Sequence, residues 1–256
     1  MHKGIILCDL DGTLLTSAKV VSLKTVDILN LCKDNGQYIG YITARSRSNK
    51  ITSILSKLPC DFVSFYNGAM IYVQNQLIEN NSLPYQQATL ILQKINNDFP
   101  DIVMDINLEP WIFSSVCNEL CHMDSGRRES CSIKNLPKCD VQRIRLKSKN
   151  NIKILLENYM TDDSIFYDTI AGDSIIVHKK ANKGYAAIKA SEYFMIPLTQ
   201  MIAFGDDTSD IDMIKLVGTG VAMGNSTPRL KGVADYITDT NDNDGIASWL
   251  IKYFKI

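Results

Sequence analysis

Residues 4–13 read GIILCDLDGT, an apolar run that ends in two aspartates separated by one residue and then a glycine. The unbroken apolar run predicts a β-strand covered on both faces, as in a parallel sheet. Asp9 and Asp11 follow it directly, and ligands of open parallel sheets bind beyond the carboxyl ends of the strands. Side chains two residues apart share one side of an extended chain, and Gly12 allows a sharp turn. We therefore interpret Asp9 and Asp11 as residues of a functional site, in preference to solvated acids at a strand end.

The region that follows this strand alternates helical and strand-like patterns. Helices are expected at 22–35 and 46–57, strands at 38–42 and 62–66, and a hairpin at 69–80 that turns at Gln74-Asn75. The βαβαβ order predicts a parallel sheet with right-handed crossovers.

From about residue 82 the pattern changes to short strands mixed with two helices, which predicts a separate small α+β unit. The alternation of helices and strands returns at Lys183 and continues to the last residues. We therefore predict an α/β fold in which a Rossmann-like parallel sheet, with helices on both faces, is formed by residues 1–81 and 181–256. An α+β domain is inserted at 82–180.

Composition and charge are those of an ordinary globular protein. The 256 residues are 45% hydrophobic and 21% charged, with a net charge of −1, so no global field favours nucleic acid or an anionic membrane. No apolar run approaches the roughly 20 residues of a membrane-spanning helix, and the N-terminus lacks the pattern of a signal peptide. The expected location is the cytoplasm, where the seven cysteines, an odd number, are interpreted as reduced thiols.

A second acidic stretch, FGDDTSDID at 204–212, also follows an apolar strand and opens a helix. Facing the first pair of aspartates, its carboxylates would repel strongly unless a cation lay between them. An all-oxygen cluster favours a hard ion, and Mg²⁺ is expected because it keeps several waters and leaves room for a phosphate oxygen. Asp206 and Asp210 are the expected metal-side carboxylates. Asp207 and Asp212 are interpreted as solvated acids that suit the start of a helix.

Two further residues extend this pattern toward phosphate binding. Thr43 ends the strand at 38–42, where its hydroxyl and the next backbone amides, near a helix start, can cradle a phosphate. Helix capping by Thr43 is the alternative. Lys183 opens the helix at 183–194, where a lysine is unfavourable beside the helix dipole. An anionic partner for Lys183 is therefore expected.

The order DxD, Thr, Lys, GDxxxD resembles the four motifs of the haloacid dehalogenase superfamily of phosphohydrolases. DLDGT at 9–13 resembles the first motif, Thr43 the second, Lys183 the third and GDDTSD at 205–210 the fourth. The chain is also similar to the Cof-type branch in three phrases, YNGAMIY at 66–72, KGYAAI at 183–188 and GVAMGNS at 220–226. The insertion at 82–180 resembles the α/β cap domain of that branch.

The resemblance implies a Mg²⁺-dependent phosphatase with divided roles for its acids. Asp9 would attack phosphorus and form an aspartyl-phosphate. Asp11 would protonate the leaving alcohol and later activate water. Mg²⁺ would be held by the Asp9 side chain, the Asp11 carbonyl and Asp206. Asp210 would be a further metal residue or a support beside the metal.

The resemblance also implies ligands for the substrate phosphate. Thr43, the Ala44 amide and Lys183 would bind the remaining phosphate oxygens as charge redistributes in the transition state. One position departs from the family pattern, which is usually GDxxND, because Ser209 stands where an asparagine is usual. Ser209 would act on the phosphate side through water, or Asn225 would partly substitute for the missing amide.

The resulting hypothesis is a phosphoric monoester hydrolase (EC 3.1.3.-) that acts on a small phosphorylated metabolite, with sugar phosphates favoured by the resemblance. The cap would close over the site and exclude bulky substrates. No nucleic-acid or membrane partner is expected. Two alternatives stay open, a phosphomutase-type phosphotransferase and a ligand sensor that has lost turnover, the latter suggested by Ser209.

Several cap residues carry competing interpretations. The cap contains four cysteines, Cys117, Cys121, Cys131 and Cys139. Their spacing lacks a CxxC pair, so reduced thiols are favoured over a zinc site. Arg127 and Arg128 could reach a second anionic group of the substrate or belong to a solvated basic loop. Trp111 and Phe113 alternate in an expected strand, so that at least one packs in the core and the other could contact substrate.

Overall fold

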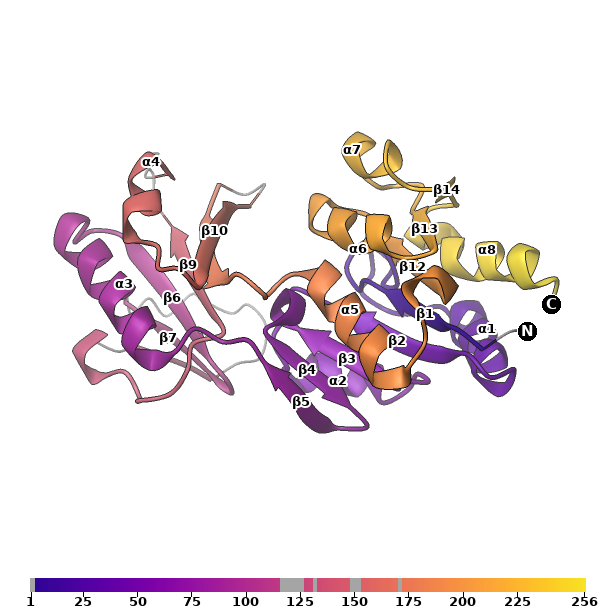
Figure 1. Cartoon of the computed structure of the whole chain (residues 1–256), viewed down its shortest axis with the longest axis horizontal. Helices are drawn as coiled ribbons and strands as arrows, with labels where there is room; N and C mark the ends of the chain where they lie inside the picture. Colours follow the sequence, from indigo (N-terminus) through magenta and orange to yellow (C-terminus); the bar gives the residue numbers. More distant parts are fainter. Residues whose placement is uncertain (1–2, 116–126, 131–132, 148–152, 170–171) are drawn as a thin grey trace. The chain divides into compact units, whose positions relative to one another are not determined.

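The computed structural model describes residues 3–115, 127–130, 133–147, 153–169 and 172–256. Its contacts divide the chain into two compact units (Figure 1). The core unit consists of Met1–Arg45, Ile51–Glu79 and Asn182–Ile256, and the inserted unit consists of Ser46–Lys50 and Asn80–Ala181. Among the described residues, no helix has the length and apolar character needed to cross a membrane.

The core unit is built on an eight-stranded sheet in the order β14-β13-β12-β1-β2-β3-β4-β5. Its strands are β1 Ile5–Cys8, β2 Tyr38–Ile42, β3 Phe62–Phe65, β4 Met70–Val73, β5 Gln76–Asn80, β12 Met201–Gly205, β13 Thr219–Ala222 and β14 Tyr236–Ile237. The six strands from β14 to β3 run parallel, and β4 runs antiparallel to β3. The predicted parallel sheet is therefore confirmed, with β1 between β12 and β2 at its centre.

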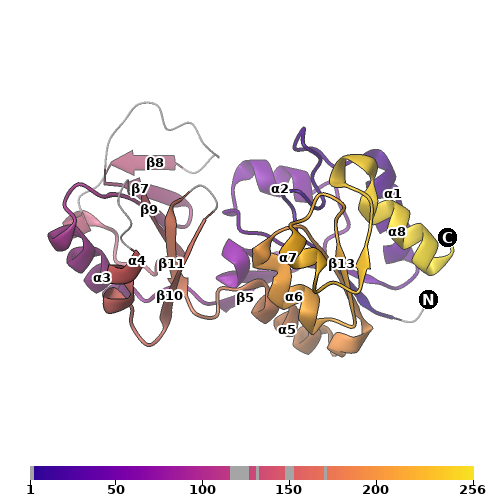
Figure 2. The same cartoon turned by 90° about the horizontal axis from the view of Figure 1, so that it is seen from above.

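Helices cover both faces of this sheet, as predicted. They are α1 Leu23–Asp34, α2 Asn49–Leu55, α5 Lys183–Phe194, α6 Ile211–Leu216, α7 Pro228–Lys231 and α8 Gly245–Phe254. Helix α5 packs with α6, and α1 packs with α8; Figure 2 shows the two pairs on opposite sides of the sheet. Ile5 and Leu7 of β1 pack in one cluster with the alanines of α5. The alternating residues of β1 are equally buried, which explains its unbroken apolar sequence.

Local sequence signals set several of these elements. The Ser22 hydroxyl accepts a hydrogen bond from the Thr25 amide and begins α1. Gln74 and Asn75 have φ of 48° and 65°, the left-handed pair that a two-residue hairpin between β4 and β5 requires. The apolar pattern of α1 does not map onto its buried face, because Leu23 is 82% exposed and the buried residues include Thr25 and Cys32.

The inserted unit contains a six-stranded sheet in the order β10-β11-β9-β6-β7-β8. Its elements are α3 Tyr85–Asp98, β6 Val103–Leu108, β7 Trp111–Ser114, β8 Arg127–Ser130, β9 Arg143–Lys147, α4 Lys153–Leu156, β10 Ser164–Asp168 and β11 Ser174–His178. The pairings are antiparallel except for that of β7 with β8. This mixture of helices with an antiparallel sheet confirms the predicted α+β architecture of the insertion.

One face of this second sheet carries the hydrophobic core of the inserted unit. Met104, Ile106 and Leu108 alternate along β6 and pack with the buried face of α3. Phe113 is buried in the same cluster and Trp111 packs against it. Phe113 is therefore the core residue expected of the pair, and a substrate contact of the half-buried Trp111 stays a prediction.

The structure corrects one local prediction in the inserted unit and leaves another outside its range. Arg127–Ser130 form β8, whereas the polar sequence RRES had been interpreted in part as a basic loop. Pairing with the edge of β7 imposes the extended conformation that the residues themselves do not favour. Of the four cap cysteines only Cys139 lies within the described residues, where it is exposed. Cys117, Cys121 and Cys131 lie outside the described residues.

Candidate active site

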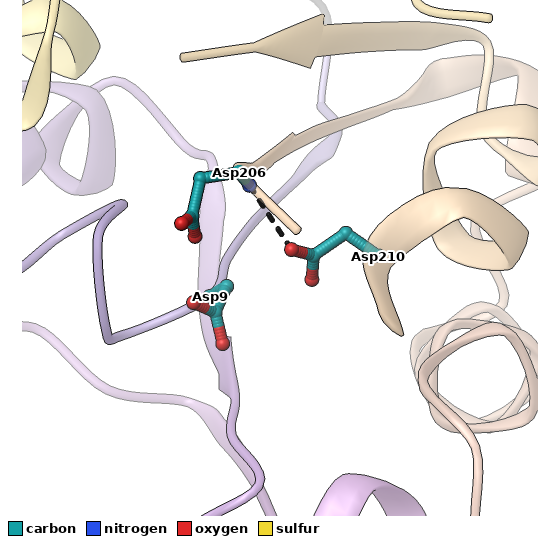
Figure 3. A group of neighbouring side chains, drawn as sticks. All are labelled: Asp9, Asp206 and Asp210. Atoms are coloured by element: carbon teal, nitrogen blue, oxygen red, sulfur yellow. Dashed lines mark hydrogen bonds between the residues drawn. The ribbon is translucent and has the colours of Figure 1, made fainter. Parts of the chain in front are cut away.

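Two adjacent parallel strands bring the two acidic motifs to the same edge of the core sheet. Strand β1 pairs in register with β12, so that Cys8 lies beside Phe204. The Asp9 amide extends the pairing by donating to the Phe204 carbonyl at 3.1 Å. Asp9 and Asp206 thus leave the sheet at neighbouring strand ends, and the carboxylates of Asp9, Asp206 and Asp210 converge beyond that edge (Figure 3).

Lys183 joins two of these carboxylates. Its Nζ donates to Asp9 Oδ1 and to Asp210 Oδ1, both at 2.6 Å. All three side chains are buried. Lys183 is the first residue of α5, whose N-cap is the Asn182 side chain. The anionic partner expected for a lysine at a helix start is therefore present, in the form of two aspartates.

Asp210 is bound through both of its oxygens. While Oδ1 accepts from Lys183, Oδ2 accepts from the backbone amides of Asp206 and Asp207, each at 3.0 Å (Figure 3 draws the first). Asp207 in turn caps the short 3₁₀ turn Thr208–Asp210 through the Thr208 amide. Asp210 therefore fixes the backbone that carries Asp206, and Asp207 has the capping role expected of a helix-start acid.

Close packing requires glycine on both strand ends. A Cβ on Gly12 would overlap the carboxylate of Asp206, and Gly12 has φ of +78°, which favours glycine. A Cβ on Gly205 would overlap the Asp210 side chain. The Thr13 hydroxyl completes the contact by donating to Asp206 Oδ1 at 2.8 Å. The glycines of DLDGT and FGDD thus allow the two strand ends to meet.

Burial dominates the titration of this cluster. Burial, together with the nearby carboxylate of Asp210, raises the pKa of Asp9 to about 8 against the opposing effect of Lys183. Burial also raises the pKa of Asp206 to about 6, although the hydrogen bond from Thr13 lowers it. For Lys183, burial lowers the pKa, but the carboxylates of Asp210 and Asp9 outweigh it and hold the pKa well above its usual range. The lysine is therefore a permanent cation that the acids share.

The donor set fits a divalent metal ion. Asp9, Asp206 and Asp210 each offer a carboxylate oxygen, and these atoms lie within 4.8 Å of one another. With all three acids ionised, the three carboxylates and the ammonium of Lys183 carry a formal net charge of −2. Hard carboxylate oxygens select Mg²⁺-like ions over soft metals. Asp210 accepts hydrogen bonds on both oxygens, and the two expectations for it, a metal ligand or a support beside the metal, both stay open.

Asp11 faces a different set of partners. Arg45 donates to both of its carboxylate oxygens, through Nε to Oδ2 and through Nη2 to Oδ1 at 2.6 Å. Lys19 donates to Oδ1 at 2.9 Å. Partial burial raises the pKa of Asp11, but the hydrogen bonds of Arg45 and Lys19 outweigh it and lower the pKa below its usual value. The pKa values of the two aspartates of DLDGT are thus shifted in opposite directions, upward for Asp9 and downward for Asp11.

Thr43 lies buried at the end of β2, next to this region. Its amide donates to the Ser64 carbonyl at 2.9 Å, and its hydroxyl accepts from the Arg45 amide at 3.1 Å. Ala44, which follows, is exposed. The Thr43 hydroxyl therefore holds the turn that carries Arg45, as well as standing at the strand end where a phosphate was predicted.

Ser209 and Asn225, the two residues considered for the role of the usual asparagine, differ in their hydrogen bonds. Ser209 is exposed, and its side chain makes no hydrogen bond to any described residue. The Asn225 amide donates to the Gly12 carbonyl at 2.8 Å, and its Oδ1 accepts from the Asn241 amide at 3.0 Å. Asn225 thus holds the backbone of the DLDGT turn with one N–H of its side-chain amide, and its partial substitution for the usual asparagine stays a prediction.

Sequence reasoning missed Arg45, Lys19 and Thr13 as members of the site. Thr13 and Arg45 each stand two residues from a predicted site residue, and this proximity was a usable signal. No such signal marks Lys19, because only the turn that closes between Thr16 and Val20 brings it back to Asp11.

The chain belongs to the haloacid dehalogenase-like hydrolases, because the sequence profile of that family matches residues 6–250. Together with its relatives, this match identifies the chain as a phosphatase of the Cof-type branch. A Bacillus subtilis phosphatase of 5-amino-6-(5-phospho-D-ribitylamino)uracil, YitU, is 27% identical over 98% of both chains. A Haemophilus influenzae protein described as a phosphatase is 28% identical over 99% of both chains.

Solved structures agree with the fold. The phosphatase BT1666 from Bacteroides thetaiotaomicron superposes with a TM-score of 0.85 at 22% identity, over 98% of this chain and 95% of its own. TM0651 from Thermotoga maritima also superposes with a TM-score of 0.85 at 22% identity, over 98% of this chain and 97% of its own. These similarities establish the shared fold, and the family assignment rests on the sequence.

Proposed function

We propose that this phosphatase is a Mg²⁺-dependent phosphomonoester hydrolase that acts through an aspartyl-phosphate on Asp9. The observation that carries the proposal is the cluster of Asp9, Asp206, Asp210 and Lys183 at the carboxyl edge of the sheet, whose formal net charge is −2 when all three acids are ionised. A divalent cation there would neutralise the charge between an anionic nucleophile and an anionic phosphate. Asp9, Asp206 and the Asp11 carbonyl would hold it, with Asp210 fixing the Asp206 backbone.

The first chemical step uses both aspartates of DLDGT. A carboxylate oxygen of Asp9 forms a bond to phosphorus as the bond from phosphorus to the alcohol oxygen breaks. Asp11 has to take up a proton before this step, because Arg45 and Lys19 hold its pKa below the usual value. Its protonated carboxyl then gives that proton to the alcohol oxygen. The alcohol leaves neutral, and Asp11 is left as a carboxylate.

The second step reverses the role of Asp11. Its carboxylate takes a proton from water, whose oxygen attacks phosphorus while the bond from phosphorus to Asp9 breaks. Inorganic phosphate leaves, and both aspartates return to their starting states. Thr43, the Ala44 amide and Lys183 would bind the oxygens that change charge in both steps. Ser209 stays a weaker proposal for this phosphate side, acting through water.

The proposed substrate is a small phosphorylated metabolite, with a sugar or sugar alcohol phosphate as the favoured class. Two relatives support this choice, since YitU and YcsE of Bacillus subtilis are both phosphatases of 5-amino-6-(5-phospho-D-ribitylamino)uracil. In that compound the phosphate is carried by a polyhydroxy chain. We propose that residues 82–180 form the cap domain that selects the substrate. The cytoplasmic location stays a prediction from the sequence.

The test is release of inorganic phosphate from a panel of phosphomonoesters, with and without added Mg²⁺. The panel covers hexose, pentose and polyol phosphates together with flavin and pyridoxal phosphates. Metal-dependent hydrolysis that Asp9→Asn abolishes is the expected result, and retained hydrolysis in Asp9→Asn contradicts the mechanism. Conversion to an isomeric phosphate without release would favour a phosphomutase. Absence of turnover on the whole panel, with retained phosphate binding, would favour a sensor.

A further inference from the structure

Asp11 is the proposed acid and base of the reaction, and the orientation of its carboxyl group depends on the side chains that bind it. The side chain is 38% exposed, and its carboxyl group could rotate freely if it had no partners. A proton donor must lie within hydrogen-bond reach of the atom that it protonates. Small misplacements of a reacting group cost large factors in rate. What holds the Asp11 carboxyl therefore matters for the chemistry.

Arg45 holds this carboxyl as a planar fork. Nε and Nη2 each bond a different oxygen of Asp11, which fixes the plane of the carboxyl group as a single contact could not. The Arg45 side chain is 15% exposed, so solvent screens the pair only partly. The fork uses one lone pair of Oδ2, and a carboxylate oxygen has a second one for a further partner.

The backbone of Arg45 is fixed as firmly as its side chain. Its amide donates to the Thr43 hydroxyl, and its carbonyl accepts from the Tyr66 amide at 3.0 Å. The guanidinium is thus tied to the turn after β2, at the strand end where the phosphate is proposed to bind. The positions of Asp11 and Thr43 are therefore coupled through one residue.

Lys19 supplies a second contact from another segment. Its Nζ donates to Asp11 Oδ1. Lys19 lies in a turn that is closed by two hydrogen bonds, because the Thr16 amide and the Thr16 hydroxyl both donate to the Val20 carbonyl. Ser17 of the same turn is anchored by its amide and hydroxyl to the carboxylate of Asp242, at 2.7 and 2.6 Å. The lysine therefore approaches from a fixed loop, although its own side chain is 48% exposed.

We propose that Arg45 is a positioning residue that orients the Asp11 carboxyl for proton transfer, with Lys19 as a weaker second support. This inference rests on the proposed role of Asp11 as general acid and base. The fork, and not the positive charge alone, does the orienting. Lysine at position 45 keeps the charge and loses the planar pair of donors, so it separates the two effects.

The chemistry of the leaving group provides the test. An alkyl phosphate such as glycerol 2-phosphate leaves as a poor anion and needs the proton from Asp11. The aryl ester p-nitrophenyl phosphate leaves as a stable anion and does not need it. Loss of orientation should therefore slow the alkyl ester selectively, whereas damage to the fold or to phosphate binding should slow both esters alike.

Four purified variants are compared on both esters with Mg²⁺ present. Arg45→Lys is expected to lower kcat/KM for the alkyl ester by about 10- to 100-fold, within the range of ~10²- to 10⁴-fold that general acid catalysis supplies, and to change the aryl ester little. Lys19→Met should show the same selectivity with a smaller loss. Arg229→Lys, at an exposed arginine of α7, is the matched control and should change neither ester. Asp11→Asn defines the full selectivity.

The outcomes separate this inference from the function on which it rests. If Asp11→Asn lowers kcat/KM equally for both esters, Asp11 is not the proton donor and the proposed mechanism fails, since kcat/KM reports the step in which the alcohol leaves. If Asp11→Asn is selective but Arg45→Lys slows both esters equally or neither, the positioning role of Arg45 is overturned. Should Arg45→Lys fail to fold, Lys19→Met carries the same comparison, because its exposed side chain is not needed for packing.

Discussion

The two units of this protein use the same residue types in opposite ways. In the core unit, Asp9 and Asp210 share the single ammonium of Lys183, and Asp206 adds a further charge. Among the described residues of the inserted unit, two acids each have their own base, since Asp105 pairs with Lys147 at 2.8 Å and Asp173 bonds Arg145 Nε at 2.6 Å.

The difference lies in charge balance. A one-to-one pairing is neutral and satisfied, so it supports the β6 and β9 strands without a ligand. An excess of two negative charges in a buried cluster is costly unless a cation compensates it. The number of bases per acid therefore distinguishes these structural pairs from the proposed metal and phosphate site. The predictions that follow test this comparison.

The largest expected effect is on the nucleophile. Asp9→Asn should reduce phosphate release by about 10³-fold or more, because an amide cannot form the acyl-phosphate. The measurement is steady-state hydrolysis together with trapping of labelled phosphoenzyme. The matched control is Asp105→Asn, the same substitution at a paired acid, which should lower thermal stability while hydrolysis of p-nitrophenyl phosphate persists. Equal loss of activity in both variants would remove the distinction between the units.

Removing the shared base should destabilise the core unit in a pH-dependent way. Lys183→Met leaves the carboxylates of Asp9 and Asp210 buried without a counter-charge, which costs about 3–5 kcal/mol for a broken buried pair. Protonation of the acids relieves that cost, so the destabilisation should be larger at pH 8 than at pH 5. Denaturant unfolding at both pH values measures it. A loss independent of pH would mean that packing of the lysine stem, and not charge, is responsible.

Metal binding should compete with protons at the same cluster. The pKa of Asp9 is raised from 3.8 to about 8 without metal, so the folded protein holds a proton that the unfolded chain has released. The contribution of Asp9 to the stability of the metal-free protein should therefore be greatest at low pH and fall as pH rises from about 4 to about 8.

Added Mg²⁺ should reverse this trend by favouring the ionised acids. At 100 times its dissociation constant it would contribute about 2.7 kcal/mol. Thermal unfolding with and without Mg²⁺, at pH 6 and pH 8, tests both signs, and titration calorimetry in two buffers detects the released proton. Asp206→Asn should abolish the response to metal. A metal effect that is equal at the two pH values contradicts the prediction.

The smallest effect is expected at the position that departs from the family pattern. Ser209→Asn should change KM more than kcat, since Ser209 is exposed and its side chain has no hydrogen-bond partner among the described residues. Initial-rate kinetics over a range of substrate concentrations separate the two parameters. A large change in kcat would place the residue in the catalytic geometry instead.

The sequence alone determined the fold class and the placement of the acids. An apolar run such as 5–8 has few structural solutions, and the alternation with helical patterns leaves only a parallel sheet with covered faces. The carboxyl ends of the strands in such a sheet share one edge, so Asp9 and Asp206, which each follow a predicted strand, were expected to lie close together. The same reasoning produced the hairpin at Gln74-Asn75, where two residues alone decide the turn.

Only the tertiary structure decided which basic side chain pairs with each aspartate. Asp9 and Asp11 are two residues apart, yet Asp9 binds a buried lysine from α5 and Asp11 binds a largely buried arginine after β2. The strand β8 exists because an edge was available, although its own sequence does not favour it. Local patterns report propensity and spacing, whereas burial and charge balance depend on every segment that packs around a group. For that reason the sequence located the acids, and the fold gave each of them its partner.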